Sequence, residues 1–509
     1  MPAAPWDNGA AAKQLFVLVT GANSGIGLGI CQRLIDDFTA AHPSTSDHLI
    51  VITTTRSAAK SRQTTDQLRQ HLVTQEARAA AAKSSLNPDR IHLASIELDL
   101  CNLPSVYAAA ERLRFSPLSI YTGAGKAASS PHVIPRLDSV IFNAGIGGWT
   151  GIGWWNLLTN VLFDGIQQAT TFPTCKAALG GLLVDPLTGK EVKGAGGAEK
   201  EGVMGQVFCA NIFGHYVFAH ALLPLLRGTD ESSNSNKTIG HSALGPGPAR
   251  IIWESSVEAV GWNNLSLDDF QAINTLAAYE SSKRLTDVLA LTAGLKGVAP
   301  ISAPFFKADD DDNTDGSNND DTTPATYVTH PGVVCSTLFP LNWFCFALYQ
   351  FAMYLSRWLG SPWHPVTAYK GAVAAVWVAL QPQSALDALD AQHVKWGAST
   401  TRGGTTLVKR SEVEGWGFRG IVGEELQSTN VDSITGKAWS DGKGDPLAEM
   451  YPYPAYLLNS RGRKKGAATL TSERRQEFEV LGRDCWQEME RLRKEWAERV
   501  RKAREEGHA

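Results

Sequence analysis

The sequence predicts an α/β fold, a doubly wound parallel sheet with long insertions and a C-terminal amphipathic helix. Three observations point to this fold. A glycine-rich turn stands between a buried strand and a helix, and further apolar runs of strand length recur along the chain. After Ser472, apolar residues recur every three or four positions among abundant Arg and Glu, as in a helix with one buried face. With 509 residues and a hydrophobic content of 43%, the chain can bury a large core.

The first predicted strand, residues 14–20, leads into the turn Thr20-Gly21-Ala22-Asn23-Ser24-Gly25-Ile26-Gly27, and residues 26–37 follow with helical spacing. Gly21 permits the sharp turn, Gly25 lets backbone N–H groups approach a pyrophosphate, and Gly27 allows the strand and helix to pack closely. The helix N-terminus adds partial positive charge. The turn therefore predicts a dinucleotide site, and an ordinary glycine-rich loop is the alternative.

The second predicted strand, residues 48–55, indicates which dinucleotide binds. It ends in threonines followed by Arg56, where a protein that binds NAD usually has an acidic residue. A guanidinium at this place is suited to bidentate pairing with a 2′-phosphate. We therefore expect NADPH and the reductive direction, with a solvated surface arginine as the alternative. Later strands are predicted at 91–98, at 139–142, at 251–254 and before His330.

Tyr279 and Lys283 stand four residues apart, on one face of a predicted helix. Reduction of a ketone needs a hydride on one face of the carbonyl and a proton donor at its oxygen, and a phenol can be that donor. A free tyrosine has a pKa near ~10, which is poorly matched to neutral pH. We expect the Lys283 ammonium to favour the phenolate and so lower the pKa of Tyr279. Ser256 is expected to hydrogen-bond the substrate carbonyl.

These motifs, in this order, resemble the short-chain dehydrogenase/reductase family, whose glycine turn has the spacing TGxxxGxG. The resemblance covers about residues 14 to 340 and implies a Rossmann-type fold and an oxidoreductase that uses a nicotinamide cofactor. It implies that the catalytic residues are Asn211, Ser256, Tyr279 and Lys283, and that Asn211 holds a water relaying protons through Lys283. The implied cofactor-binding residues are Thr20, Gly21, Asn23, Ser24, Gly25, Ile26, Gly27, Arg56, Asp99, Asn143, Ala144, Gly145, Tyr279, Lys283, Pro331, Gly332, Val334 and Thr337.

We expect residues 1–470 to form a single NADP-binding domain and residues 471–509 to form the C-terminal amphipathic helix. The domain carries predicted insertions at 147–205 and 263–274, an acidic loop at 307–323 and an apolar segment at 338–360. The acidic loop has almost no apolar side chain to bury, which predicts disorder. Its aspartates lack EF-hand spacing, so no metal site is expected.

The apolar segment follows Thr337 directly, and no charged residue occurs from Ser336 to Ser356. We predict a helix that covers a large lipid-like substrate and also dips into one membrane leaflet, with Trp358 and Trp363 at interfacial depth. A buried core helix and a transmembrane anchor are the alternatives, although Pro340, Asn342 and Gln350 interrupt a clean span.

Composition limits the other classes of partner. A net charge of −4 gives no general reason to expect nucleic-acid binding. The seven cysteines are scattered without metal-ligand spacing and indicate reduced thiols in a protein that faces the cytosol. No secretory signal is evident in the first residues. The basic cluster at 461–465 is a candidate contact for lipid headgroups, or else a solvated turn.

The large inserts, the wide gap between Ser256 and Tyr279 and the apolar segment resemble the fungal reductases that act on ketosterols in ergosterol biosynthesis. This resemblance implies NADPH-dependent reduction of the 3-ketone of 4-demethylated sterol intermediates to the 3β-alcohol. It also implies a place at the cytosolic face of the endoplasmic reticulum or on lipid droplets, beside other enzymes of sterol C-4 demethylation. Two alternatives remain open, a reductase of other lipophilic carbonyls such as retinal and a non-catalytic NADPH-binding scaffold.

Overall fold

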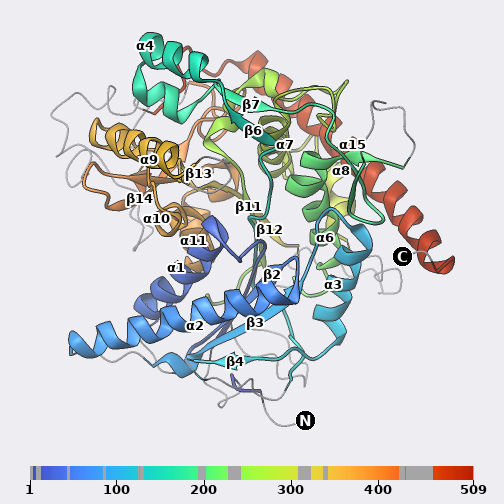
Figure 1. Cartoon of the computed structure of the whole chain (residues 1–509). Coiled ribbons are helices and arrows are strands. Elements are labelled where there is room, and N and C mark those ends of the chain that lie inside the picture. The colour runs from blue at the N-terminus through green and yellow to red at the C-terminus, as the bar shows by residue number, and fades with distance from the viewer. Residues whose placement is uncertain are drawn as a thin grey trace.

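The computed structural model describes residues 4–6, 13–42, 46–83, 87–123, 125, 131–192, 202–226, 242–307, 323–335, 342–423, 430–431 and 462–507. A ten-stranded sheet forms its centre, with the strand order β15-β14-β13-β12-β11-β5-β1-β2-β3-β4 (Figure 1). The strands are β1 (Gln14–Val19), β2 (His48–Thr55), β3 (Ile91–Glu97), β4 (Tyr121–Thr122), β5 (Ser139–Phe142), β11 (Arg250–Glu254), β12 (Ala325–His330), β13 (Lys395–Thr400), β14 (Thr406–Ser411) and β15 (Asn430–Val431).

The strands from β3 through β2, β1, β5, β11 and β12 to β13 all run parallel, and β4, β14 and β15 add antiparallel edges. Along the chain, β1, β2 and β3 follow one another in one direction across the sheet. The next parallel strand, β5, lies on the opposite side of β1. In open α/β sheets, ligands bind outside the carboxyl ends of the strands at such a reversal. The sheet therefore places a ligand crevice between the ends of β1 and β5.

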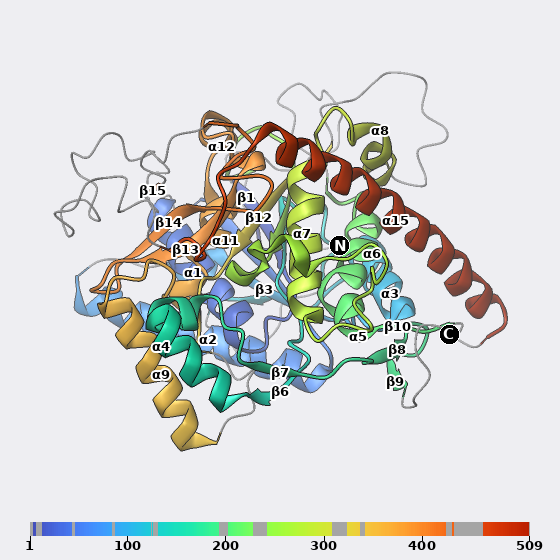
Figure 2. The ribbon, with the colours of Figure 1, turned by 90° about the horizontal axis from the view of Figure 1, so that it is seen from above.

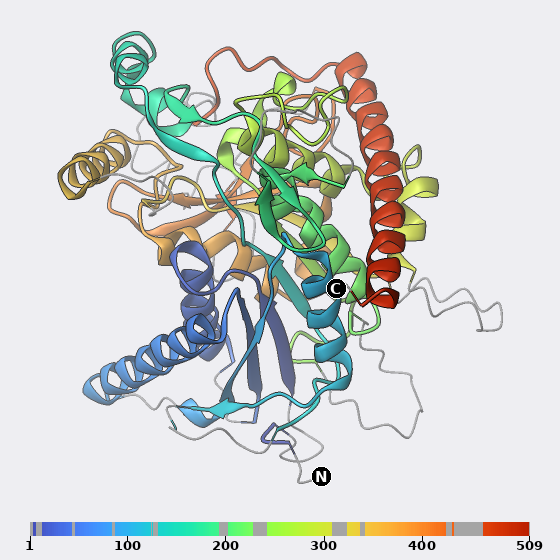
Figure 3. The same ribbon diagram turned by 45° about the vertical axis from the view of Figure 1, so that its right-hand side comes forward.

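Helices cover both faces of the sheet (Figures 1 and 3). One apolar core lies under α1 (Gly25–Ala41), α2 (Ala58–Ala81), α10 (Ala368–Gly371) and α11 (Val373–Leu380). The other lies under α3 (Leu103–Phe115), α6 (Gly214–Ala221) and α7 (Ala278–Thr292). Three shorter helices are α5 (Gln206–Phe208), α8 (Ala299–Ser302) and α12 (Gln383–Ala388). The predicted doubly wound α/β fold is confirmed.

The predicted C-terminal helix is α15 (Ser472–Glu505), which begins where the side chain of Thr471 accepts a hydrogen bond from the N–H of Arg474. It lies along α7 on the outside of the second core (Figure 2). The Trp486 indole donates to the carbonyl of Leu289, 3.2 Å away, and the Tyr216 hydroxyl donates to Glu490 at 2.8 Å. The buried stripe of α15 thus completes the core over α7.

The insert at 147–205 contributes two small sheets and a helix. Strands β6 (Trp149–Ile152) and β7 (Lys176–Ala178) pair with each other, and α4 (Trp154–Thr171) connects them. Strands β8 (Leu183–Asp185), β9 (Lys190–Val192) and β10 (Met204–Gly205) form the second sheet. The insert at 263–274 is a loop that follows a single 3-10 turn at Trp262–Asn264. Of the acidic loop, residues 308–322 lie outside the described residues.

The apolar segment forms α9 (Trp343–Trp358), whose first turn is capped by the side chain of Asn342. Its outer face is open to solvent, with Trp343 82% exposed, so α9 is not a buried core helix. It runs beside α4 (Figure 2), where the hydroxyls of Thr170 and Ser356 lie 2.9 Å apart. Within the described parts of the chain, no helix is long and apolar enough to cross a membrane.

Candidate active site

The glycine-rich turn lies at the carboxyl end of β1. Gly21 and Gly25 have left-handed backbone, with φ of +66° and +55°. A Cβ at Gly21 would lie 2.8 Å from the Cβ of Ala144, and one at Gly27 would lie 2.3 Å from the Gly21 carbonyl oxygen. At Gly25, by contrast, a Cβ would meet no heavy atom of the described residues within 4 Å. The turn therefore opens in front of the α1 N-terminus, and this space fits a dinucleotide pyrophosphate.

Thr20 fixes the turn to the loop after β5. Its hydroxyl oxygen accepts hydrogen bonds from the N–H groups of Asn143 at 2.9 Å and Ala144 at 3.1 Å. The Asn143 amide in turn donates to the Thr20 carbonyl, 3.0 Å away. These contacts between β1 and β5 close the base of the crevice at the reversal of strand order. Its upper edge is left for a ligand.

A buried histidine that the sequence did not single out as functional joins this turn to α6. Nε2 of His215 lies 2.9 Å from the Thr20 hydroxyl, and Nδ1 lies 3.2 Å from the carbonyl oxygen of Asn211. Burial lowers the pKa of His215 to about 3, so the ring is neutral. With Thr20 donating to Nε2, the Nδ1–H donates to Asn211, and one tautomer satisfies both contacts.

Asn211 lies in a π-helical turn, Cys209–Phe213, a distortion that is frequent at functional sites. Its amide pairs with both backbone groups of Ile146, at 2.7 and 3.0 Å. The same amide donates to the Ser282 hydroxyl at 3.0 Å, which in turn donates to the Tyr279 carbonyl. Asn211 therefore sets the position of α7 relative to the loop after β5, and its water-holding role stays a prediction.

The structure brings Ser256, Tyr279 and Lys283 together. The Ser256 hydroxyl is near enough to the Tyr279 phenol to lower its pKa, whereas the neighbouring Ser255 hydroxyl donates to the Lys283 carbonyl, 3.2 Å away. The Lys283 ammonium lies 5.9 Å from the Tyr279 ring centroid. Between the two serines, Ser256 is thus the one placed to meet a substrate beside the phenol.

The pKa of Tyr279 does not move in the direction expected from the sequence. Burial raises it above its ordinary value, the Glu258 carboxylate raises it further, and Lys176 and Ser256 lower it. Burial also lowers the pKa of Lys283 to about 8, partly offset by Glu254 and Asp287. The expected lowering of the Tyr279 pKa is therefore wrong for this structure, because desolvation outweighs the effects of Lys176 and Ser256.

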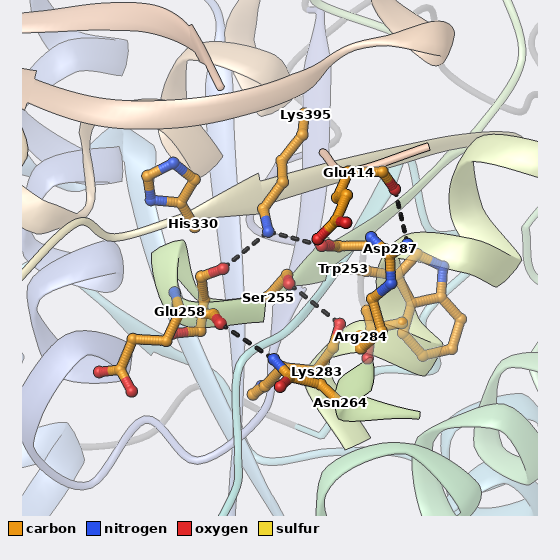
Figure 4. Close-up of polar contacts among 12 residues, drawn as sticks. Trp253, Ser255, Glu258, Asn264, Lys283, Arg284, Asp287, His330, Lys395 and Glu414 are labelled. Atoms are coloured by element: carbon orange, nitrogen blue, oxygen red, sulfur yellow. Dashed lines mark hydrogen bonds and ion pairs between the residues drawn. The ribbon is translucent and has the colours of Figure 1, made fainter. Parts of the chain in front are cut away.

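Behind Ser256 lies a fully buried ion pair (Figure 4). The Lys395 ammonium, from β13, donates to the Asp287 carboxylate at 2.6 Å and to the Ser256 carbonyl at 2.7 Å. Asp287 is one helical turn beyond Lys283 on α7. Sequence reasoning missed Lys395 because β13 is far from both partners along the chain.

The structure also places the other residues that the sequence predicts to bind the cofactor. The Ala22 N–H donates to the Thr54 carbonyl at 3.3 Å, so the glycine turn lies beside the end of β2 and Arg56. Arg56 is exposed and makes no ion pair with the described residues. Asn23, Ser24 and Ile26 are exposed or half-buried at the start of α1. The Asp99 carboxylate accepts the Cys101 N–H at 3.0 Å and so faces its own loop.

The loop after β12 carries the predicted residues Pro331, Gly332 and Val334. Gly332 has φ of +64°, and a Cβ there would lie 2.7 Å from the Ala398 carbonyl oxygen. Pro331 is buried, and Val334 forms a bridge with Val366. Gly145 sits against Asn211, whose Oδ1 would be 2.8 Å from an added Cβ. Thr337 lies outside the described residues.

No family model matches the chain. Among curated proteins, it is 41% identical to the 3-keto-steroid reductase ERG27 of Gibberella zeae over 501 residues, which span 97% of this chain and 96% of that protein. The chain belongs to the 3-keto-steroid reductase family. As a 3-keto-steroid reductase family member it is an oxidoreductase, and the predicted similarity to fungal ketosterol reductases is confirmed.

Other 3-keto-steroid reductases match over most of their length. The protein of Aspergillus fumigatus is 38% identical over 493 residues, 95% of this chain and 94% of its own. The protein of Saccharomyces cerevisiae is 28% identical over 407 residues, 79% of this chain and 91% of its own. Among solved structures, a metagenomic short-chain oxidoreductase in complex with NADP aligns over 73% of this chain and 93% of its own, at 16% identity and a TM-score of 0.31. Within the described residues, no cluster of three or more metal-ligating side chains occurs.

Proposed function

We propose that this chain reduces the 3-ketone of 4-demethylated sterol intermediates to the 3β-alcohol with NADPH, in ergosterol biosynthesis. The observation that carries the proposal is the meeting of Ser256, Tyr279 and Lys283 beside an open glycine turn. It is supported by 41% identity over 97% of the chain to a protein named 3-keto-steroid reductase.

The side chains have separate roles in the proposed reaction. Bound NADPH supplies the hydride. The Ser256 hydroxyl holds the substrate carbonyl oxygen, and Tyr279 gives that oxygen its phenolic proton, so that the ketone becomes an alcohol. The Lys283 ammonium is fixed by a 2.6 Å hydrogen bond to the Glu254 carbonyl and keeps a positive charge near the phenol. Trp149, whose ring meets that of Tyr279 at 4.7 Å, closes one side of the site against water.

The choice of NADPH rests on Arg56. It is the cation at the end of β2, next to the glycine turn, and its guanidinium is exposed toward solvent. A planar guanidinium binds a 2′-phosphate through two parallel hydrogen bonds, and a 2′-hydroxyl offers no charge for it. The strand end has Thr53, Thr54 and Thr55 where an acid would otherwise select NAD.

The protein exposes an apolar face, here called the α4–α9 face, which suits an enzyme that acts on a lipophilic substrate. It consists of exposed aromatic and aliphatic side chains on the two helices: Trp154, Trp155, Leu158, Leu162, Phe163, Trp343, Phe344, Leu348, Phe351 and Trp358. Soluble proteins rarely expose so large an apolar surface unless it binds something. We propose that this face lies in one leaflet of a membrane, at the cytosolic side of the endoplasmic reticulum or on a lipid droplet, beside other enzymes of sterol C-4 demethylation.

Charge favours a lipid surface over a protein partner at the α4–α9 face. The Lys465 ammonium pairs with Asp164 at the middle of α4, and Gln168 of α4 donates to the Arg463 carbonyl at 2.7 Å. A basic loop thus flanks exposed Leu162 and Phe163, as in helices that lie on anionic membranes. On its other side α9 carries Tyr349, whose pKa is raised by burial and by Cys335, Glu258 and Cys175.

An assay of purified protein with NADPH and a 4-demethylated 3-ketosterol tests the proposed function. We expect NADPH oxidation and a 3β-alcohol product, and a loss of about 100-fold or more in kcat for Tyr279→Phe with NADPH binding retained. Tyr121→Phe, on the distant edge strand β4, is the matched control. Preference for retinal or short ketones would support another carbonyl reductase, and cellular function retained by Tyr279→Phe would support the scaffold.

A further inference from the structure

The antiparallel β6–β7 pair of the insert carries a lysine to the two segments that hold Ser256 and Tyr279. The Lys176 ammonium pairs with the carboxylates of Glu258 and of Glu280, the latter at 2.8 Å. The N–H of Glu258 donates to the Ser256 hydroxyl at 3.2 Å, and Glu280 directly follows Tyr279. One ammonium, with its side chain only 6% exposed, thus joins the segment after β11 to the start of α7.

Two aromatic rings enclose the same ammonium. Nζ of Lys176 lies 4.2 Å from the ring centroid of Trp149 and 5.2 Å from that of Tyr279. The two rings meet edge to face at 4.7 Å. Cation–π attraction is strongest where water is excluded, as it is here. The insert therefore contributes a cation and an indole to the immediate surroundings of the proposed acid.

The charges around Tyr279 come from several elements. Glu258 after β11 and Glu280 on α7 raise the pKa of Tyr279, and Lys176 on β7 lowers it. Lys283 on α7 also lies near the ring. Burial raises the pKa of Glu258 to about 7, with Lys176 lowering it, and the Cys175 thiol and Tyr349 phenol also face that carboxylate. Loss of Lys176 would leave two carboxylates beside the phenol with no cation between them.

We propose that Lys176 is a positioning residue that holds Glu258 and Glu280 together and thereby fixes Ser256 and Tyr279 for the reaction. This inference rests on the proposed ketone reduction. It follows that the insert at 147–205 completes the catalytic site. A charged residue here also acts on the phenol through space, which distinguishes its role from packing alone.

Kinetics of Lys176→Met, Lys176→Arg and Lys176→Met/Glu258→Gln test the proposal, with Lys190→Met on exposed β9 as control. We expect Lys176→Met to lower kcat about tenfold with little change in the KM for NADPH. In the reverse, alcohol-oxidising direction the phenol must lose its proton, so a raised tyrosine pKa moves the rise in activity about one pH unit upward. Lys176→Arg and the double variant should recover most of the rate, and Lys190→Met should match the wild type.

A wild-type rate and pH profile for Lys176→Met would overturn the proposal. The proposal would also be overturned if the double variant showed the same loss of rate as Lys176→Met and the pH profile did not move. That outcome would indicate damaged folding. If the wild type itself reduces no ketone, the proposed function fails instead. In that case the role of Lys176 is tested by the ultraviolet titration of the Tyr279 phenol, measured as the difference between the protein and its Tyr279→Phe variant. This titration should move to higher pH in Lys176→Met.

Discussion

The ammonium of Lys283 donates a hydrogen bond to the carbonyl oxygen of Glu254, and the two atoms lie 2.6 Å apart. This contact ties α7, which carries Tyr279, to the end of β11, which leads into Ser255 and Ser256. Two segments that are separate in sequence are thereby held at one distance. The proposed acid and the proposed carbonyl ligand depend on that distance, because proton transfer requires both within hydrogen-bond reach of one oxygen.

The cofactor preference should depend on Arg56. We expect Arg56→Ala to raise the KM for NADPH about tenfold or more and to leave the KM for NADH nearly unchanged, because only NADPH carries the 2′-phosphate. Steady-state kinetics with both cofactors measure this. Arg78→Ala, at the exposed far end of α2, serves as the control. Equal effects on both cofactors would show that Arg56 does not contact the phosphate.

The α4–α9 face should bind lipid. Phe163→Glu with Trp343→Glu changes two side chains that are 79% and 82% exposed, so the fold should be unaffected. We expect this variant to lose most of its flotation with vesicles of phosphatidylcholine and phosphatidylserine. Lys465→Gln should weaken binding to these vesicles and leave binding to neutral ones unchanged. Phe115→Glu, on distant α3, is the matched control, and its flotation should equal that of the wild type.

Removal of Lys395 should destabilise the protein, because it leaves the Asp287 carboxylate buried without its partner. We expect Lys395→Met to lower the free energy of unfolding by about 3–5 kcal/mol. Urea denaturation measures this change. Adding Asp287→Asn should restore a large part of the loss, since the carboxylate that lost its partner is then removed. For comparison, Arg491→Gln breaks exposed pairs with Glu488 and Glu495 and should cost less than about 1 kcal/mol.

The buried Glu254 carboxyl should make stability depend on pH. Burial raises its pKa from the usual 4.5 to about 7, although Thr329, Lys283 and Lys395 oppose the shift. Between these values the folded state binds more protons than the unfolded state, so stability falls as pH rises. We expect Glu254→Gln to have a higher Tm than the wild type at pH 8 and a smaller advantage at pH 4.5. A constant difference across this range would show that the carboxyl is already ionised in the folded protein.

Several parts of the site could be predicted because their geometry is local. The turn from Thr20 to Gly27 is fixed by a strand, three glycines and a helix that are consecutive in sequence. Tyr279 and Lys283 share a face of α7 because four residues make about one helical turn. The buried stripe of α15 has the same cause. These inferences needed no knowledge of what lies across the sheet.

Other parts could not be predicted, because they depend on contacts between distant segments. Nothing near Lys176 or Lys395 in the sequence indicates that each meets a carboxylate close to Ser256. The bridge that His215 makes from Thr20 to Asn211 could not be predicted either, because it requires β1 and α6 to be adjacent. The exposed pairing of α4 with α9 likewise joins an insert to a segment far along the chain.

By itself, the sequence determined the strands β1, β2, β3, β5, β11 and β12, the glycine-rich turn and the spacing of the tyrosine and lysine, since each follows from neighbouring residues. Only the tertiary structure decided which charges surround the phenol, and in which direction its pKa moves. The reason is that desolvation and Coulomb interactions depend on distance in space, and a folded chain brings residues together irrespective of their separation in sequence.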